Sequence, residues 1–155
     1  KSYFDEANIR GWKVGAAGGD DNHTANWGTF TGYRVAVLAS DLTRLDIFEA
    51  LKARRFYSTL DKNLALSFKI NGHEMGSTIN AGYCNIEIQA FDGDKEAFRK
   101  VELKKMGTTI QTWDISTPSV NLIHSITTKP GEYYYVVIQQ NDGNEAISSP
   151  IYIEE

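Results

Sequence analysis

The chain of 155 residues contains a single cysteine, three prolines and no surplus of positive charge. One cysteine, Cys84, excludes an intrachain disulfide framework. Because Cys84 opens an alternating apolar run, we interpret it as a small core residue rather than a reactive thiol. The net charge is −4, and the one basic run, Lys52 to Arg55, is short. This charge balance argues against nucleic acid as a partner.

Long apolar runs are also absent from the sequence. No stretch approaches the roughly 20 residues that a membrane-spanning helix needs, so we expect no membrane partner. The chain begins at Lys1 without a methionine, and its first residues already belong to a structural pattern. We therefore interpret it as a processed or truncated piece of a longer protein. The lack of a signal peptide therefore leaves open whether the parent is periplasmic or secreted.

The chain changes character near residue 60. Before that point, residues 3–11 predict a short helix that ends at Gly11, because glycine is a common helix stop. Small residues in 12–19 predict a buried strand, and residues 33–39 form a compact apolar run that predicts another. The order of strand, polar loop, strand and helix is typical of an α/β unit. One unit cannot cover both faces of a parallel sheet, so residues 1–60 resemble the tail of a larger α/β domain.

The clearest helix signal follows the second of these strands. Thr43 can cap the helix, with Asp46 as the return partner of a capping box. Lys52, Arg54 and Arg55 lie in the last turn, where basic side chains interact favourably with the helix dipole. The sequence therefore predicts a helix that begins after Thr43.

Residues 61–155 read as a series of short strands with turn signals between them. Seven or so strands of this kind predict a β-sandwich. Tyrosines at the start of residues 133–140 resemble the penultimate strand of an immunoglobulin-like sandwich, where a tyrosine ties the corner. We expect Tyr133, Tyr134 and Tyr135 to be core and sheet-face residues rather than a sugar-binding platform. The predicted fold is thus mainly β, an immunoglobulin-like β-sandwich preceded by an α/β segment.

The triplet Asp21-Asn22-His23 is the sharpest candidate for chemistry. In extended backbone, its two end side chains point the same way. A carboxylate and an imidazole together suit Zn²⁺, Mn²⁺ or Fe²⁺. Gly18 and Gly19, just before the triplet, allow close backbone approach. A solvated polar turn is the competing interpretation.

Four motifs in order give the chain a family resemblance. GWKVGAAGGDDNH resembles the final motif of the PHP (polymerase and histidinol phosphatase) superfamily. ASDLTRLDIFEALKARRFYST, FKINGHEMGS and ISSPIYIEE resemble, in the same order, later motifs of its phosphoesterase branch. ALKARRFYST followed by NGHEMG is the most specific part. The departure is Asp20, where the superfamily commonly has serine.

The resemblance implies a distorted β/α barrel that holds two or three divalent metal ions and hydrolyses phosphoesters with a metal-activated water. Residues 1–60 would be the C-terminal segment of that barrel, and Asp21 and His23 its last ligand pair. The other ligand motifs are missing from this sequence, and we interpret His73 and His124 as surface or structural residues. We therefore expect the chain alone to bind metal weakly and to be inactive.

Arg54, Arg55 and Tyr57 are candidate contacts to a substrate phosphate at the barrel mouth, or else a helix end with favourable basic residues. The implied partners are the missing N-terminal barrel of the same protein and a phosphorylated small molecule. An orphaned α/β surface could also pair two copies. Two further interpretations stay open: a non-catalytic sandwich that binds a glycan or a protein, and a sandwich that braces the barrel.

Overall fold

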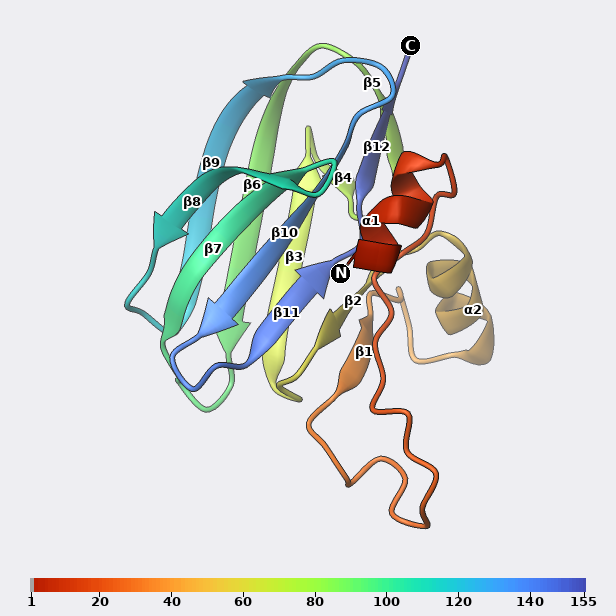
Figure 1. Cartoon of the computed structure of the whole chain (residues 1–155), viewed down its shortest axis with the longest axis vertical. Helices are drawn as coiled ribbons and strands as arrows, with labels where there is room; N and C mark the ends of the chain where they lie inside the picture. Colours follow the sequence, from red (N-terminus) through yellow and green to blue (C-terminus); the bar gives the residue numbers. More distant parts are fainter. Residues whose placement is uncertain (1) are drawn as a thin grey trace.

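The computed structural model describes residues 2–155, which form two antiparallel-rich β-sheets packed face to face (Figure 1). The mainly β sandwich predicted from the sequence is thereby confirmed. The larger sheet has eight strands: β1 (Arg34–Val37), β2 (Phe56–Thr59), β5 (Thr78–Asn80), β7 (Phe98–Lys105), β8 (Thr108–Asp114), β10 (Tyr133–Gln140), β11 (Glu145–Ser148) and β12 (Ile151–Glu154). The smaller sheet has four: β3 (Leu64–Ile70), β4 (His73–Glu74), β6 (Tyr83–Asp92) and β9 (Ser119–Thr127).

The core lies between the two sheets and follows from the alternation along each strand. On β3, Leu66 and Phe68 face inward, and on β6 the inward residues are Cys84, Ile86 and Ile88, all buried. The prediction that Cys84 is a core residue is confirmed. Burying a side chain of this kind stabilises the fold by about 1.5–3 kcal/mol, so this layer supplies most of the driving force for folding.

Strand β10 is buried on both faces, whereas its neighbour β7 is buried mainly on one face. Tyr134 faces the core, whereas Tyr133 and Tyr135 belong to a second apolar cluster on the outer face of the larger sheet. Helix α1 (Ser2–Ile9) covers this outer face, and Phe4 packs edge-on against Tyr135 with ring centroids 5.3 Å apart. The expectation that the three tyrosines serve the core and sheet face, not an open platform, is confirmed.

Both predicted helices are present. Helix α1 stops just before Gly11, which adopts a φ of +87°. Helix α2 (Arg44–Lys52) starts where the capping box predicted, because the Thr43 hydroxyl accepts a hydrogen bond of 3.1 Å from the Asp46 amide. Neither helix, nor any other in residues 2–155, has the length and hydrophobicity to span a membrane.

The strand predicted over residues 12–19 is wrong. These residues belong to neither sheet, and they lie over the outer face of β2. The sequence did not predict strand β2, because its residues directly follow the helix pattern. It pairs with β1 on one side and β11 on the other, so the larger sheet continues across residue 60.

Candidate metal-binding loop

Asp21 and His23 lie on a loop that leaves the sandwich before β1 and returns to it (Figure 1). His23 Nε2 is 3.6 Å from Asp21 Oδ1, and the two side chains are 80% and 94% exposed. Asp21 adopts a φ of +48°, a left-handed conformation that lets a single residue turn the chain. The carboxylate and the imidazole are therefore side by side and open to solvent.

Polar side chains within the loop that carries Asp21 and His23 form hydrogen bonds with one another. Asn22 turns inward: its Oδ1 accepts from the Thr24 amide at 2.7 Å and its Nδ2 donates to Asn26 Oδ1 at 3.0 Å. The Thr31 hydroxyl donates to Asp20 Oδ2 at 2.9 Å. Asp20, the residue that departs from the superfamily pattern, thus closes the base of the loop.

Two glycines bring the chain before the loop against β2. A Cβ on Gly15 would lie 2.4 Å from the Phe56 ring, and one on Gly18 would lie 2.3 Å from Ser58 Oγ. Any other residue at these positions would require the segment or the facing side chains to shift. Of the two glycines that the sequence singled out before the metal ligands, Gly18 therefore has a packing role, whereas a Cβ on Gly19 would meet nothing within 4 Å.

The C-terminal motif SSPIYI anchors the same segment. Ser149 Oγ accepts from the Ala16 amide at 3.0 Å and donates to the Phe56 carbonyl at 2.6 Å. The Tyr152 hydroxyl lies 2.9 Å from the Val14 carbonyl and 2.8 Å from Asn8 Oδ1. Residues more than 130 positions apart in sequence thus hold the loop's entry in place. No local signal in the sequence identifies these anchors.

Arg54 serves the fold rather than an open surface. It adopts a φ of +59°, and its Nη2 donates to the Gly76 carbonyl at 3.0 Å. Its guanidinium also lies over the Tyr152 ring, 5.7 Å from the centroid. The motifs ALKARRFYST and NGHEMG therefore pack against each other, with Met75 fully buried beside this contact.

Tyr57 does not fit the predicted substrate role. Its side chain is buried, and its hydroxyl donates to the Leu64 carbonyl at 2.7 Å. Burial raises the pKa of Tyr57, so the phenol stays neutral and structural. Arg55 differs from Tyr57, because its Nε, like the Nε of Arg54, is buried with no hydrogen-bond partner among residues 2–155.

The remaining histidines are far from the loop in the fold. His73 lies on β4, and the ring of His124 on β9 packs edge-on against Trp113, with centroids 5.5 Å apart. Among residues 2–155, no three His, Cys, Asp or Glu side chains come together closely enough to hold a metal ion. Asp21 and His23 can thus supply two ligands of a site, fewer than a tight zinc site needs.

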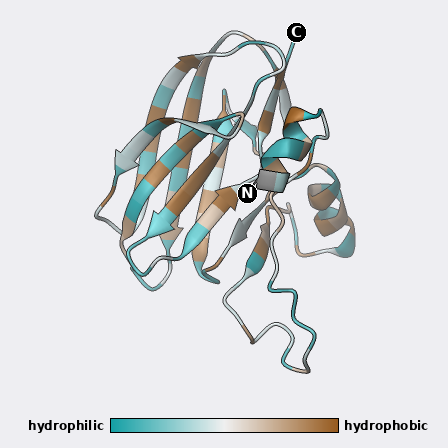
Figure 2. Cartoon of the chain, in the orientation of Figure 1, coloured by the Kyte–Doolittle hydropathy of each residue, from teal (hydrophilic) through white to brown (hydrophobic). Residues whose placement is uncertain are grey.

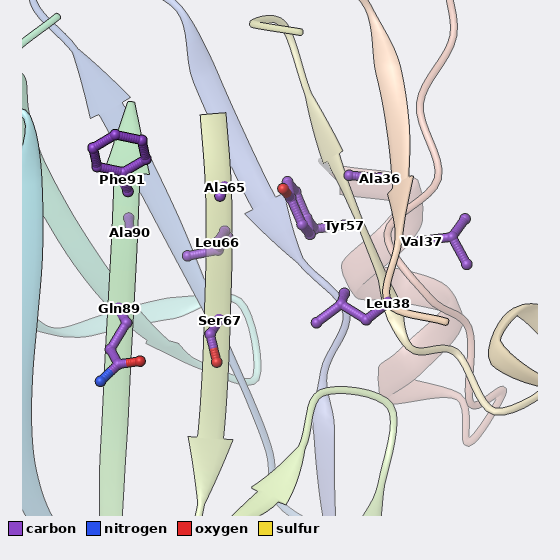
Figure 3. Close-up of a pocket in the computed structure, with 10 residues that line it drawn as sticks. All are labelled: Ala36, Val37, Leu38, Tyr57, Ala65, Leu66, Ser67, Gln89, Ala90 and Phe91. Carbon is purple, nitrogen blue, oxygen red and sulfur yellow. The ribbon is translucent and has the colours of Figure 1, made fainter. Parts of the chain in front are cut away.

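A hollow of about 380 Å³ opens between β1, β2 and the smaller sheet (Figure 3). Sequence reasoning gave no sign of it. Its walls are mainly apolar and include Ala36, Leu38, Tyr57, Leu66, Ala90 and Phe91. Ser67 and Gln89 add polar groups, but none of the lining residues is charged, so this hollow is unsuited to a phosphate ester.

Comparisons with known proteins give distant relatives. No family model matches the chain. An uncharacterized protein of Chlamydia pneumoniae is 28% identical over 137 residues, and one of Chlamydia muridarum is 26% identical over 137 residues. Each match covers 77% of this chain but 22% of the relative, so the chain spans about a fifth of their length. A crystal structure of an engineered protein aligns over 59% of this chain and 20% of its own, with 10% identity and a TM-score of 0.38.

Proposed function

We propose that this chain is the C-terminal part of a PHP-type metal-dependent phosphoesterase, in which Asp21 and His23 are two of the metal ligands. The observation that carries the proposal is the exposed pair itself, with His23 Nε2 3.6 Å from Asp21 Oδ1. The ions would be Zn²⁺, Mn²⁺ or Fe²⁺, which this ligand pair suits. Bound metal would supply an activated water and stabilise charge on the phosphoryl oxygens.

The apolar surface of the first 51 residues supports a missing partner domain. Ten large apolar side chains are exposed there: Tyr3, Ile9, Trp12, Trp27, Phe30, Val35, Leu42, Leu45, Phe48 and Leu51. Figure 2 shows hydrophobic residues on helix α2, at the rim of the molecule. Exposed apolar surface on this scale marks an interaction site. The N-terminal barrel of the same protein is the partner we propose, and association of two copies is the alternative.

The backbone of residues 13–19 supports the same partner. Within the described chain, this segment makes one backbone–backbone hydrogen bond, from the Ala17 amide to the Gly15 carbonyl at 3.1 Å. Side chains already pair the amides of Val14 and Ala16 and the carbonyl of Val14, and the remaining backbone groups of the segment would pair with another strand. In the proposed parent, residues 13–19 would pair as the last strand of the barrel, with Asp21 and His23 just beyond its end.

The sandwich, which we infer to be an immunoglobulin-like module, would brace that barrel. Its outer tyrosines contact α1, and Ser149 and Tyr152 hold the loop's entry segment. Binding of a glycan has less support. Tyr83 and Phe91 are exposed on one face of β6 but stand eight residues apart, which is about 26 Å along a strand and too far for one sugar ring.

The test is metal-dependent hydrolysis of p-nitrophenyl phosphate by the longer protein that the proposal requires. Asp21→Ala and His23→Ala should each abolish turnover, whereas His73→Ala should leave it unchanged. The isolated chain should bind Mn²⁺ or Zn²⁺ weakly in a calorimetric titration and show no turnover. Full activity of the longer protein with both ligands replaced would refute the proposal, and so would robust hydrolysis by the isolated chain.

A further inference from the structure

A buried carboxylate without a counter-charge lies at the opposite end of the core from the helices. Asp92, the last residue of β6, is 0% exposed. No Lys, Arg or His among residues 2–155 forms an ion pair with it, although Lys62 and Lys95 are close in sequence. A buried charge needs compensation by an opposite charge or a bound metal ion.

A second carboxylate shares its hydrogen-bond donor with Asp92. Gln140, at the end of β10, is 1% exposed. Its Nε2 lies 2.9 Å from Asp92 Oδ2 and 3.1 Å from Oδ2 of Asp61, in the turn between β2 and β3. One neutral amide thus donates to two carboxylates, and no ion pair within residues 2–155 balances either charge.

Two buried amide oxygens at this end have no hydrogen-bond partner among the described residues. They are Gln140 Oε1 and Asn63 Oδ1. Rotating the Gln140 amide by half a turn exchanges its nitrogen and oxygen, an exchange that leaves the shape of the side chain unchanged. Gln140 Oε1 would then face both carboxylates. Asn63 lies beside the same turn, since its carbonyl accepts from the Gly93 amide at 3.2 Å.

Backbone amides hold both carboxylates in place. The Asn63 amide donates to Asp61 Oδ1 at 3.1 Å, and the Glu96 amide donates to Asp92 Oδ1 at 2.7 Å. Each carboxylate therefore keeps its other oxygen directed at Gln140, as outer contacts do for metal ligands.

We propose that Asp61, Asp92, Gln140 and Asn63 form a Ca²⁺ site that ties together the loops at this end of the sandwich. All four donors are oxygens, two from carboxylates and two from amides, which is the ligand set that Ca²⁺ prefers. Water completes its six to eight ligands. The absence of imidazole and thiolate donors disfavours Zn²⁺. This site is separate from Asp21 and His23 and does not depend on the phosphoesterase proposal.

The test is thermal unfolding of the chain after chelator treatment, with and without about 10 mM CaCl₂. For a Kd of about 0.1 mM, the midpoint should rise by roughly 5–10 °C. Asp92→Asn and Asp61→Asn should each remove the rise, whereas Asp21→Asn should retain it. In chelator, Asp92→Asn should melt no lower than the unsubstituted chain, because the amide removes an unbalanced buried charge and keeps the shape.

Calorimetric titration of the unsubstituted chain with CaCl₂ gives a second measurement that needs no variant to fold. One Ca²⁺ per chain should bind, and MgCl₂ and ZnCl₂ should bind more weakly. The inference fails if CaCl₂ neither binds nor raises the midpoint. It also fails if the rise survives in both Asp92→Asn and Asp61→Asn, or if Zn²⁺ binds this end more tightly than Ca²⁺.

Discussion

The first 55 residues and the sandwich that follows them differ in how they bury apolar surface. Within residues 2–55, only Ala16 and Ala50 belong to the buried apolar set, and large apolar side chains such as Leu42 are almost fully exposed. In the sandwich, whole strands such as β10 are buried. The two regions have similar fractions of apolar residues, so they differ in how much of that apolar surface other parts of the chain cover.

Polar contacts and close backbone approach hold the two regions together. Tyr133 and Tyr135 donate to Asp5 Oδ1 at 3.2 and 2.9 Å, and Ser149 fixes the segment before the loop. Contacts of this kind need specific geometry and contribute about 0.5–1.5 kcal/mol each, or more to a charged group. The sandwich therefore positions the N-terminal segment, which contributes only partly buried residues such as Ala36 and Leu38 to the core.

The largest expected effect on stability comes from comparing the removal of a phenylalanine ring from the sandwich with the removal of one from helix α2. Phe68→Ala deletes a fully buried ring and should lower the free energy of unfolding by about 3–5 kcal/mol. Phe48→Ala removes a ring that is 59% exposed and should change it by less than about 0.5 kcal/mol. Urea denaturation followed by tryptophan fluorescence measures both. Equal losses in the two variants would mean that α2 is part of the core.

The contact between Arg54 and the NGHEMG motif predicts the next largest effect. Gly76 has a φ of +89°, and a Cβ there would lie 2.2 Å from the Ala53 carbonyl oxygen. Gly76→Ala should therefore cost about 2–4 kcal/mol, from the left-handed backbone and the clash together. Gly28→Ala is the matched control, because Gly28 has a φ of +76° with open space around it, and should cost about 1 kcal/mol. Denaturation midpoints of both variants give the comparison.

Alkaline pH should weaken the tyrosine layer that joins the two regions. Burial raises the pKa of Tyr133, Tyr135 and Tyr152 far above 10, so they stay neutral in the folded chain. In the unfolded chain they ionise near pH 10, so their stabilisation is complete below that pH and is lost above it. Each should cost about 1 kcal/mol between pH 10 and 11.

Stability measured by urea denaturation from pH 7 to 11 checks this prediction. Tyr135→Phe lacks the ionising group and should reduce the loss above pH 10 by about 1 kcal/mol, while lowering stability at pH 7 through the missing bond to Asp5. An identical decline with pH in Tyr135→Phe and the unsubstituted chain would show that Tyr135 ionises equally in both states.

Local signals in the sequence were enough to predict the elements that form from neighbouring residues. The Asn71-Gly72 turn has φ values of 50° and 78°, as the dipeptide indicates, and the strands on either side follow their alternation. Segment 12–19 misled the prediction because its small apolar residues are typical of a strand, yet a strand needs a partner that residues 2–155 do not offer. β2 was missed because RRFYST continues the helix pattern.

The candidate loop shows the same limit. Spacing alone brought Asp21 and His23 together, because neighbours in sequence stay neighbours in space. The contacts that fix the loop, from Ser149 and Tyr152, come from the other end of the chain and leave no periodic signature. Arg54 and Tyr57 were candidate substrate contacts because their polar groups suit a phosphate, whereas in the fold Arg54 Nη2 donates to the Gly76 carbonyl and the Tyr57 hydroxyl to the Leu64 carbonyl.

The smallest expected effect concerns the cap of α2, which was predicted from sequence alone. Thr43→Ala removes the acceptor for the Asp46 amide and should destabilise the helix by about 1 kcal/mol. Because Ala50 is the only fully buried residue of α2, this helix should open without the sandwich. Amide exchange within α2 should then accelerate about fivefold, since 1 kcal/mol corresponds to that factor, while β6 amides exchange as before. Equal acceleration in α2 and β6 would show that both regions unfold as one unit, and the contrast between them would be one of exposure alone.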